Sequence, residues 1–140
     1  MVCVTDTELY KTVLKEYNYT FGNVYIFKDF VISEFFPEIV ITWDDHAKLI
    51  VDDVSAFYNT DGSNVVYISN RIHSYSVMAS DWLKFFKNNY TIKAYCIVSK
   101  NEVGFLNSMI EKLFFKNKII HFKNLYEAVN FVKKGLIEIA

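Results

Sequence analysis

The chain has 140 residues, about the size of one domain, and with 52% hydrophobic residues it can build a core without a disulfide or a metal. Its formal net charge is -1, and lysines are interspersed with acidic residues, so the chain lacks the basic stripe that would bind nucleic acid. Its two cysteines, Cys3 and Cys96, are expected to be free thiols in a reducing compartment.

The sequence carries no signal for export or for membrane insertion. Its first residues lack the basic and apolar regions of a signal peptide, and no segment reaches the roughly 18 consecutive apolar residues of a membrane span. We therefore expect a cytoplasmic protein that forms one domain over residues 1–140, with a flexible segment over residues 1–9.

The N-terminal part of the chain predicts an antiparallel β-meander. Residues 10–17 form the weakest strand candidate, whereas the runs 23–27 and 30–35 are rich in β-branched and aromatic residues. A tight turn at Lys28 and Asp29 separates these two runs.

The hydrophobic period then changes to that of an amphipathic helix over residues 42–59. Thr42 is the expected N-cap, and Asp44 and Asp45 follow in the first turn, where the helix dipole favours acidic side chains. The apolar stripe of this helix consists of Ala47, Ile50, Val51, Val54, Phe57 and Tyr58.

Strands and helices alternate over the rest of the chain. Buried strands are predicted at 64–69, 92–99 and 118–122. Helices are predicted at 79–89, with Ser76 or Ser80 as its cap, at 101–115 and at 124–135, where Gly135 ends the last one. The inward stripes of the last two helices are Leu106, Met109, Ile110 and Leu113, and Leu125, Ala128, Val129 and Val132. This order predicts an α/β fold, with a central, largely parallel sheet flanked by helices.

No motif indicates catalysis, a metal or a cofactor. The four glycines are too dispersed for a phosphate-binding loop, and no G-x-S-x-G elbow is present. The histidines have no second ligand at metal-binding spacing, and the clustered aspartates share one predicted helix, where a solvated face explains them better than a cation site. We therefore expect a protein that is not an enzyme, with no metal site and no cofactor. The residues concerned are His46, His73, His121, Asp44, Asp45, Asp52 and Asp53.

An aromatic stripe on the helix 79–89 has two interpretations. Trp82, Phe85 and Phe86 lie three and four residues apart, so they share one face of the helix. Ordinary core packing explains this spacing, and the alternative is a pocket for a small molecule or a lipid, which requires an enclosed apolar cavity.

The loop after the strand 64–69 is the best candidate for a binding site. Loops at the carboxyl ends of parallel strands line the binding crevice of open α/β sheets. This one contains Arg71, the only arginine of the chain, which either holds an anion or bonds carbonyls or a carboxylate such as Glu34. A phosphoryl group on Ser74 or Ser76 is a further alternative. The candidate binding residues are Ser69, Asn70, Arg71, His73, Ser74, Tyr75 and Ser76.

Several stretches together resemble the SpoIIAA-like proteins of the STAS superfamily, and in particular its small single-domain members of the Bacteroidetes type. They are FGNVYIFKDFVISEF, TWDDHAKLI, VVYISNRIHSYSV, WLKF, EKLFF and NLYEAVNFV, and the resemblance extends from about Gly22 to Lys133. The resemblance implies a mixed sheet flanked by helices, no catalytic machinery, and a serine after a central strand that a partner kinase phosphorylates. The bacterial antagonists carry an Asp-Ser-Ser-Gly-type signature there, and this chain has IHSYSV instead.

We therefore expect a regulatory module that binds a protein partner through residues 69–76. The alternative is a domain that binds a small molecule or a lipid in an apolar pocket. A homodimer is a further arrangement that the sequence allows.

Overall fold

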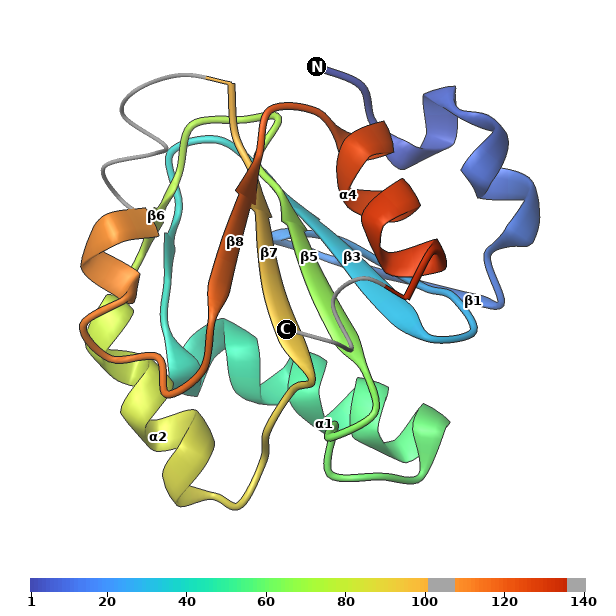
Figure 1. Cartoon of the computed structure of the whole chain (residues 1–140). Helices are drawn as coiled ribbons and strands as arrows, with labels where there is room; N and C mark the ends of the chain where they lie inside the picture. Colours follow the sequence, from blue (N-terminus) through green and yellow to red (C-terminus); the bar gives the residue numbers. More distant parts are fainter. Residues whose placement is uncertain (101–107, 136–140) are drawn as a thin grey trace.

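The computed structural model describes residues 1–100 and 108–135, and its centre is a six-stranded mixed sheet (Figure 1). The first three strands form an antiparallel meander, and the others add to it in parallel. The predicted α/β class, with a mixed central sheet and flanking helices, is therefore confirmed. In spatial order the strands are β1 (Lys15–Tyr19), β2 (Gly22–Ile26), β3 (Phe30–Phe35), β5 (Val66–Asn70), β7 (Ala94–Val98) and β8 (Ile119–Phe122).

The first strand is shorter than the sequence suggested. Two short 3-10 helices, η1 (Val4–Asp6) and η2 (Glu8–Thr12), precede it and occupy much of the segment that we expected to be flexible. Val4 is fully buried against the core, so this segment packs on the sheet.

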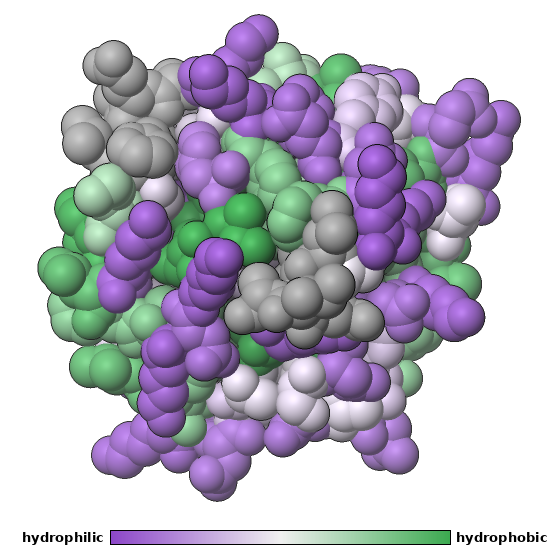
Figure 2. Space-filling model, viewed as in Figure 1, coloured by the Kyte–Doolittle hydropathy of each residue, from purple (hydrophilic) through white to green (hydrophobic). Residues whose placement is uncertain are grey.

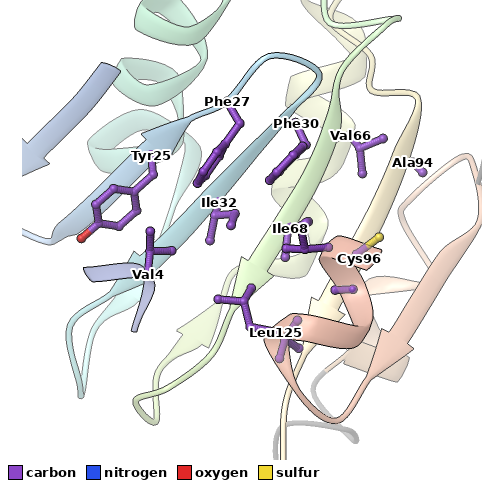
Figure 3. Packing of buried hydrophobic residues seen from close by; sticks show 13 residues of the cluster. Val4, Tyr25, Phe27, Phe30, Ile32, Val66, Ile68, Ala94, Cys96 and Leu125 are labelled. Atoms are coloured by element: carbon purple, nitrogen blue, oxygen red, sulfur yellow. The ribbon is translucent and has the colours of Figure 1, made fainter. Parts of the chain in front are cut away.

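The helices divide between the two faces of the sheet. The strands β3, β5 and β7 follow one another in order, so right-handed crossovers place α1 (Lys48–Tyr58) and α2 (Trp82–Lys87) on the same face. The last helix, α4 (Leu125–Lys133), lies on the opposite face together with the N-terminal turns (Figure 1). Figure 3 shows the core on that face, where Leu125 packs near Ile68 and Cys96.

Two helix ends agree with the sequence signals. The Thr42 hydroxyl accepts a hydrogen bond from the backbone N–H of Asp45 at 3.2 Å, as an N-cap should. The first turn, η3 (Trp43–Ala47), has π-helical bonding and leads into α1. Gly135 has a φ of 70° just after α4, a conformation that favours glycine, so the predicted stop is confirmed.

The cap predicted for α2 is wrong. Ser76 belongs to a two-residue strand, β6 (Ser76–Val77), which pairs in parallel with β4 (Val40–Ile41). Ser80 lies inside a 3-10 turn, η4 (Ala79–Asp81), and the residue before that turn offers no side-chain cap. The chain after β5 thus makes a second, small parallel ribbon before it reaches the helix.

The inward stripe predicted for residues 101–115 is also wrong where the structure describes it. Leu106 lies outside the described residues, and Met109, Ile110 and Leu113 are 45%, 53% and 77% exposed. The helical turn at 108–111 instead directs Glu111 toward the sheet, where its carboxylate accepts hydrogen bonds from Arg71 and Tyr95. Hydrophobic side chains consequently gather at the surface on this side of the molecule (Figure 2).

Candidate functional site

The site is built where β5 ends, because alternate residues of a strand point to opposite faces of the sheet. Ser69 and Arg71 point to the face that carries α2, whereas Asn70 points to the face that carries the N-terminal turns. The predicted loop therefore supplies two separate buried polar clusters.

Arg71 lies at the centre of the first cluster. Its Nε donates to the Ser69 hydroxyl at 3.1 Å, and its Nη2 donates to the Tyr95 hydroxyl at 2.8 Å and to the Glu111 carboxylate at 2.5 Å. The guanidinium also lies 5.5 Å from the ring centre of Tyr75. The Nε and Nη2 atoms of Arg71 are thus bonded to partners within the protein.

Glu111 accepts hydrogen bonds from three donors within the described part of the chain. Besides Arg71, the Tyr95 hydroxyl donates to Glu111 at 2.7 Å, and the indole N–H of Trp82 donates at 2.9 Å. The side chains of Arg71 and Glu111 are only 5% and 1% exposed, so this ion pair is shielded from water and from salt.

The electrostatics of this cluster keep Arg71 charged and Tyr95 neutral. Burial lowers the pKa of Arg71, but Tyr95, Tyr75 and Glu111 more than offset that effect and raise it well above its ordinary value. Burial and the neighbouring Glu111 together raise the pKa of Tyr95 far above the usual range. The Tyr95 hydroxyl therefore keeps its proton at neutral pH and donates it in the hydrogen bond to Glu111.

The second cluster, on the other face, contains the carboxylate that we considered as the partner of Arg71. Glu34 instead accepts hydrogen bonds from the Asn70 amide at 2.7 Å and from the backbone N–H of Val4 at 2.8 Å. The Asn70 amide also donates to the Val2 carbonyl at 3.0 Å. Burial raises the pKa of Glu34, although these hydrogen bonds oppose the shift. This cluster fastens the N-terminal segment to the sheet.

The candidate residues of the loop thus separate by exposure. The buried ones hold the loop in place, and they are Ser69, Asn70, Arg71 and Tyr75, with the hydroxyls of Ser69 and Tyr75 2.9 Å apart. The exposed ones are His73, Ser74 and Ser76. Both serines are accessible to a modifying enzyme.

The small ribbon extends this exposed surface. Val40 and Ser76 are register partners in the β4–β6 pair and both are exposed. Glu38 lies two residues before Val40, and Met78 two residues after Ser76, and both are also exposed. We call these residues, with Ser74, the ribbon surface: Glu38, Val40, Ser74, Ser76 and Met78.

A separate apolar pocket lies between α1, α2 and the sheet. It has a volume of about 130 Å³ and is lined by Trp82 and Phe85 of the aromatic stripe, whereas Phe86 packs in the core beside them. The pocket is apolar, but it is partly open to solvent and so is not the enclosed cavity that the ligand-binding alternative requires.

The three histidines do not come together. The ring Nδ1 of His46 accepts a hydrogen bond from the Thr42 backbone N–H at 3.0 Å, His73 is exposed, and His121 lies in β8. Over residues 1–100 and 108–135, no group of three potential metal-ligating side chains is found. Within the same ranges, no helix is long and apolar enough to cross a membrane.

No family model, curated protein or solved structure matches the chain.

Sequence reasoning missed three members of the Arg71 cluster: Tyr95, Glu111 and the indole N–H of Trp82. Tyr95 lies within an apolar run, and Glu111 lies outside the apolar stripe that we predicted for residues 101–115. The one available signal was Arg71 itself, because an arginine directly after a buried strand needs a carboxylate partner.

Proposed function

We propose that this chain is a non-enzymatic, cytoplasmic regulatory module of the STAS type that binds a protein partner through the loop 69–76 and the ribbon surface. The N-terminal meander followed by alternating parallel strands and helices supports this proposal, because it agrees with the fold that the SpoIIAA-like resemblance implies.

The observation that carries the proposal is the buried position of Arg71. Its hydrogen bonds to Ser69, Tyr95 and Glu111 fix the loop to the face of the sheet that carries α2. Backbone hydrogen bonds to the segment before β4 also fix the loop. The Glu38 N–H donates to the Ser74 carbonyl at 2.8 Å, and the Ser76 N–H donates to the Ile39 carbonyl at 2.9 Å. A surface that is ordered before binding loses less conformational entropy when a partner binds.

The chemistry of the ribbon surface suits a protein partner. It combines exposed apolar side chains, Val40 and Met78, with the hydroxyls of Ser74 and Ser76. Phosphorylation of either serine would add a charge of roughly -1.5 to -2 beside Glu38, and this would weaken an apolar contact. The proposed switch therefore uses Ser74 or Ser76 in place of the serine of the family signature.

Site-specific photocrosslinking in the cells of origin tests the proposed partner surface. A crosslinking amino acid is placed at position 76 and, as a control, at position 130, because Asn130 is exposed on α4, on the opposite face. We expect a protein that crosslinks at position 76 and not at position 130. The yield of this crosslink should fall at least about tenfold with Ser74→Asp. Asn130→Asp adds the same charge on the opposite face and should leave the yield unchanged.

Three outcomes would overturn the proposal. They are identical crosslinks at both positions, a yield that ignores Ser74→Asp, and capture of only a second copy of this chain. The switch is tested separately by the intact mass of the chain from its own cells, followed by mapping of any phosphoryl group to Ser74 or Ser76. A phosphoryl group found elsewhere would contradict it.

A further inference from the structure

The helix α1 lies over the sheet without burying any of its residues. Its apolar stripe, with Ile50, Val51 and Val54, is only half-buried, although an amphipathic helix of 11 residues normally seals its apolar side against a sheet. The apolar surface that remains between α1 and the sheet lines a pocket.

The pocket is about 130 Å³ in volume. An engineered apolar cavity of about 150 Å³ in another protein stays dry and binds benzene, so this volume suits a molecule with a single ring. A two-chain lipid does not fit in a space of this size. The floor is formed by Val24, Val31 and Tyr67 of the sheet, and the roof by Ile50, Val54 and Phe85 of the helices.

The polar atoms of four of the aromatic walls, Tyr58, Tyr67, Trp82 and Tyr95, are already bonded within the protein. The hydroxyl of Tyr67 is 2.6 Å from that of Ser33, and the hydroxyl of Tyr58 donates to backbone carbonyls of the β2–β3 hairpin. The hydroxyl of Tyr95 and the indole N–H of Trp82 both donate to Glu111. A ligand would therefore meet the faces and edges of these four rings and not their hydrogen-bonding atoms.

The charges around the pocket exclude an anionic ligand. Among the described residues that line it, none is lysine or arginine, and the two charged ones, Asp61 and Asp81, are acidic. A carboxylate or a phosphate would be desolvated there without a cation to pair with. Aromatic walls in turn favour an aromatic ligand, because ring pairs gain stabilisation beyond the area that they bury.

We propose that the pocket between α1, α2 and the sheet binds a small, uncharged aromatic molecule with a single ring. The pocket adjoins the proposed protein contact, because Met78 belongs to the ribbon surface and also lines the pocket. Binding in the pocket would close the gap beneath α1. A bound ring would contact Trp43 and Trp82, both of which line the pocket.

Titration of the intact chain with toluene, followed by methyl NMR, tests this proposal. We expect saturable shifts of the methyl groups that line the pocket and no shifts on the opposite face of the sheet, together with a change in tryptophan emission. Benzoate, a ring of similar size with a negative charge, is expected to bind at least about tenfold more weakly. The pocket methyls are those of Ile50, Val51 and Val54, and the control methyls are those of Ile68, Val98 and Val129.

A variant that fills the pocket provides the second arm of the test. Val54→Phe should weaken toluene binding at least about tenfold, whereas Leu49→Phe, on the exposed side of α1, should leave it within about twofold. If Val54→Phe does not fold, the shift map of the unaltered chain decides. The proposal is overturned if toluene does not saturate the pocket methyls, if both faces shift equally, if benzoate binds as well as toluene, or if a folded Val54→Phe variant binds normally.

Discussion

Arg71 and Glu111 form a buried ion pair that joins the loop after β5 to the helical turn at 108–111, 40 residues further along the chain. Burying two charges has a large desolvation cost, so such a pair is weak evidence for stability. Here the ion pair orients the loop, because it holds the Arg71 side chain in one position at the end of β5. The same burial makes Arg71 unsuitable as a surface probe of partner binding, and exposed positions such as Ser74 are the cleaner choice.

Removing one member of this pair should be strongly destabilising. Arg71→Met leaves the Glu111 carboxylate buried without its cation, and we expect the free energy of unfolding to fall by about 3–5 kcal/mol. Urea denaturation measures this change. The double variant Arg71→Met/Glu111→Leu removes both charges and should recover much of the loss, and a double variant that loses the sum of the two single effects would contradict this account.

Glu34 should make the protein less stable as the pH rises. Burial raises its pKa in the folded state, so between the ordinary pKa and the raised one the folded chain keeps a proton that the unfolded chain has lost. In that pH window the free energy of unfolding falls as the pH rises. Above the window the folded chain carries the full cost of burying the ionised Glu34 carboxylate.

Glu34→Gln removes this penalty. The variant should be more stable above the window, by on the order of 1 kcal/mol, and its stability should depend less on pH. The new amide also offers a donor near Asn70 Oδ1, which is buried and has no hydrogen-bond partner within residues 1–100 and 108–135. Denaturation between about pH 4 and pH 8 tests this, with the exposed Glu38→Gln as the control, and equal pH profiles for the two variants would refute it.

The sequence was informative where local chemistry decides the structure. Strand 30–35 was predicted with its observed bounds, and Thr42 and Gly135 mark helix ends through their own hydrogen-bonding and backbone properties. The α/β class followed from the alternation of such segments, because alternation itself favours crossover connections.

Features that depend on register were out of reach. Ser33 pairs with Ser69, so the next residues, Glu34 and Asn70, come level on one face while Arg71 turns to the other. Which carboxylate Arg71 meets therefore depends on a pairing that one sequence does not specify. The ribbon of β4 and β6 has only two residues in each strand, too few to form an alternating pattern.

The finding that the helical turn at 108–111 and the residues after it expose their predicted inward stripe can be tested directly. Leu113 is 77% exposed, so Leu113→Ser should change the free energy of unfolding by no more than about 0.5 kcal/mol. Phe115 is buried, with its ring centre 4.9 Å from that of Trp82, and Phe115→Ala should cost about 3–5 kcal/mol. Thermal denaturation of both variants compares them, and a large loss with Leu113→Ser would restore the stripe that the sequence predicted.

Gly62 should not tolerate a side chain. Its φ is 101°, and a Cβ there would lie 2.0 Å from the Thr91 carbonyl oxygen, a contact that requires the backbone to move. We expect Gly62→Ala to cost at least about 2 kcal/mol, from strain and overpacking together. Gly135→Ala is the control, because Gly135, just after α4, also has a positive φ. This substitution should cost only about 1 kcal/mol. Equal losses in urea denaturation would show that the close contact does not matter.

Tyr58 connects the end of α1 to the β2–β3 hairpin. Its hydroxyl donates to the Phe27 carbonyl and, at 3.0 Å, to the Phe30 carbonyl. Tyr58→Phe keeps the ring on the wall of the pocket but leaves these carbonyls without that donor, so we expect a loss of about 1–2 kcal/mol. Because α1 buries no residue of its own, the loss should also speed amide hydrogen exchange in α1 more than in α4. Phe57→Leu, at the neighbouring exposed position, is the control, and uniform exchange in both helices would show that Tyr58 does not hold α1 in place.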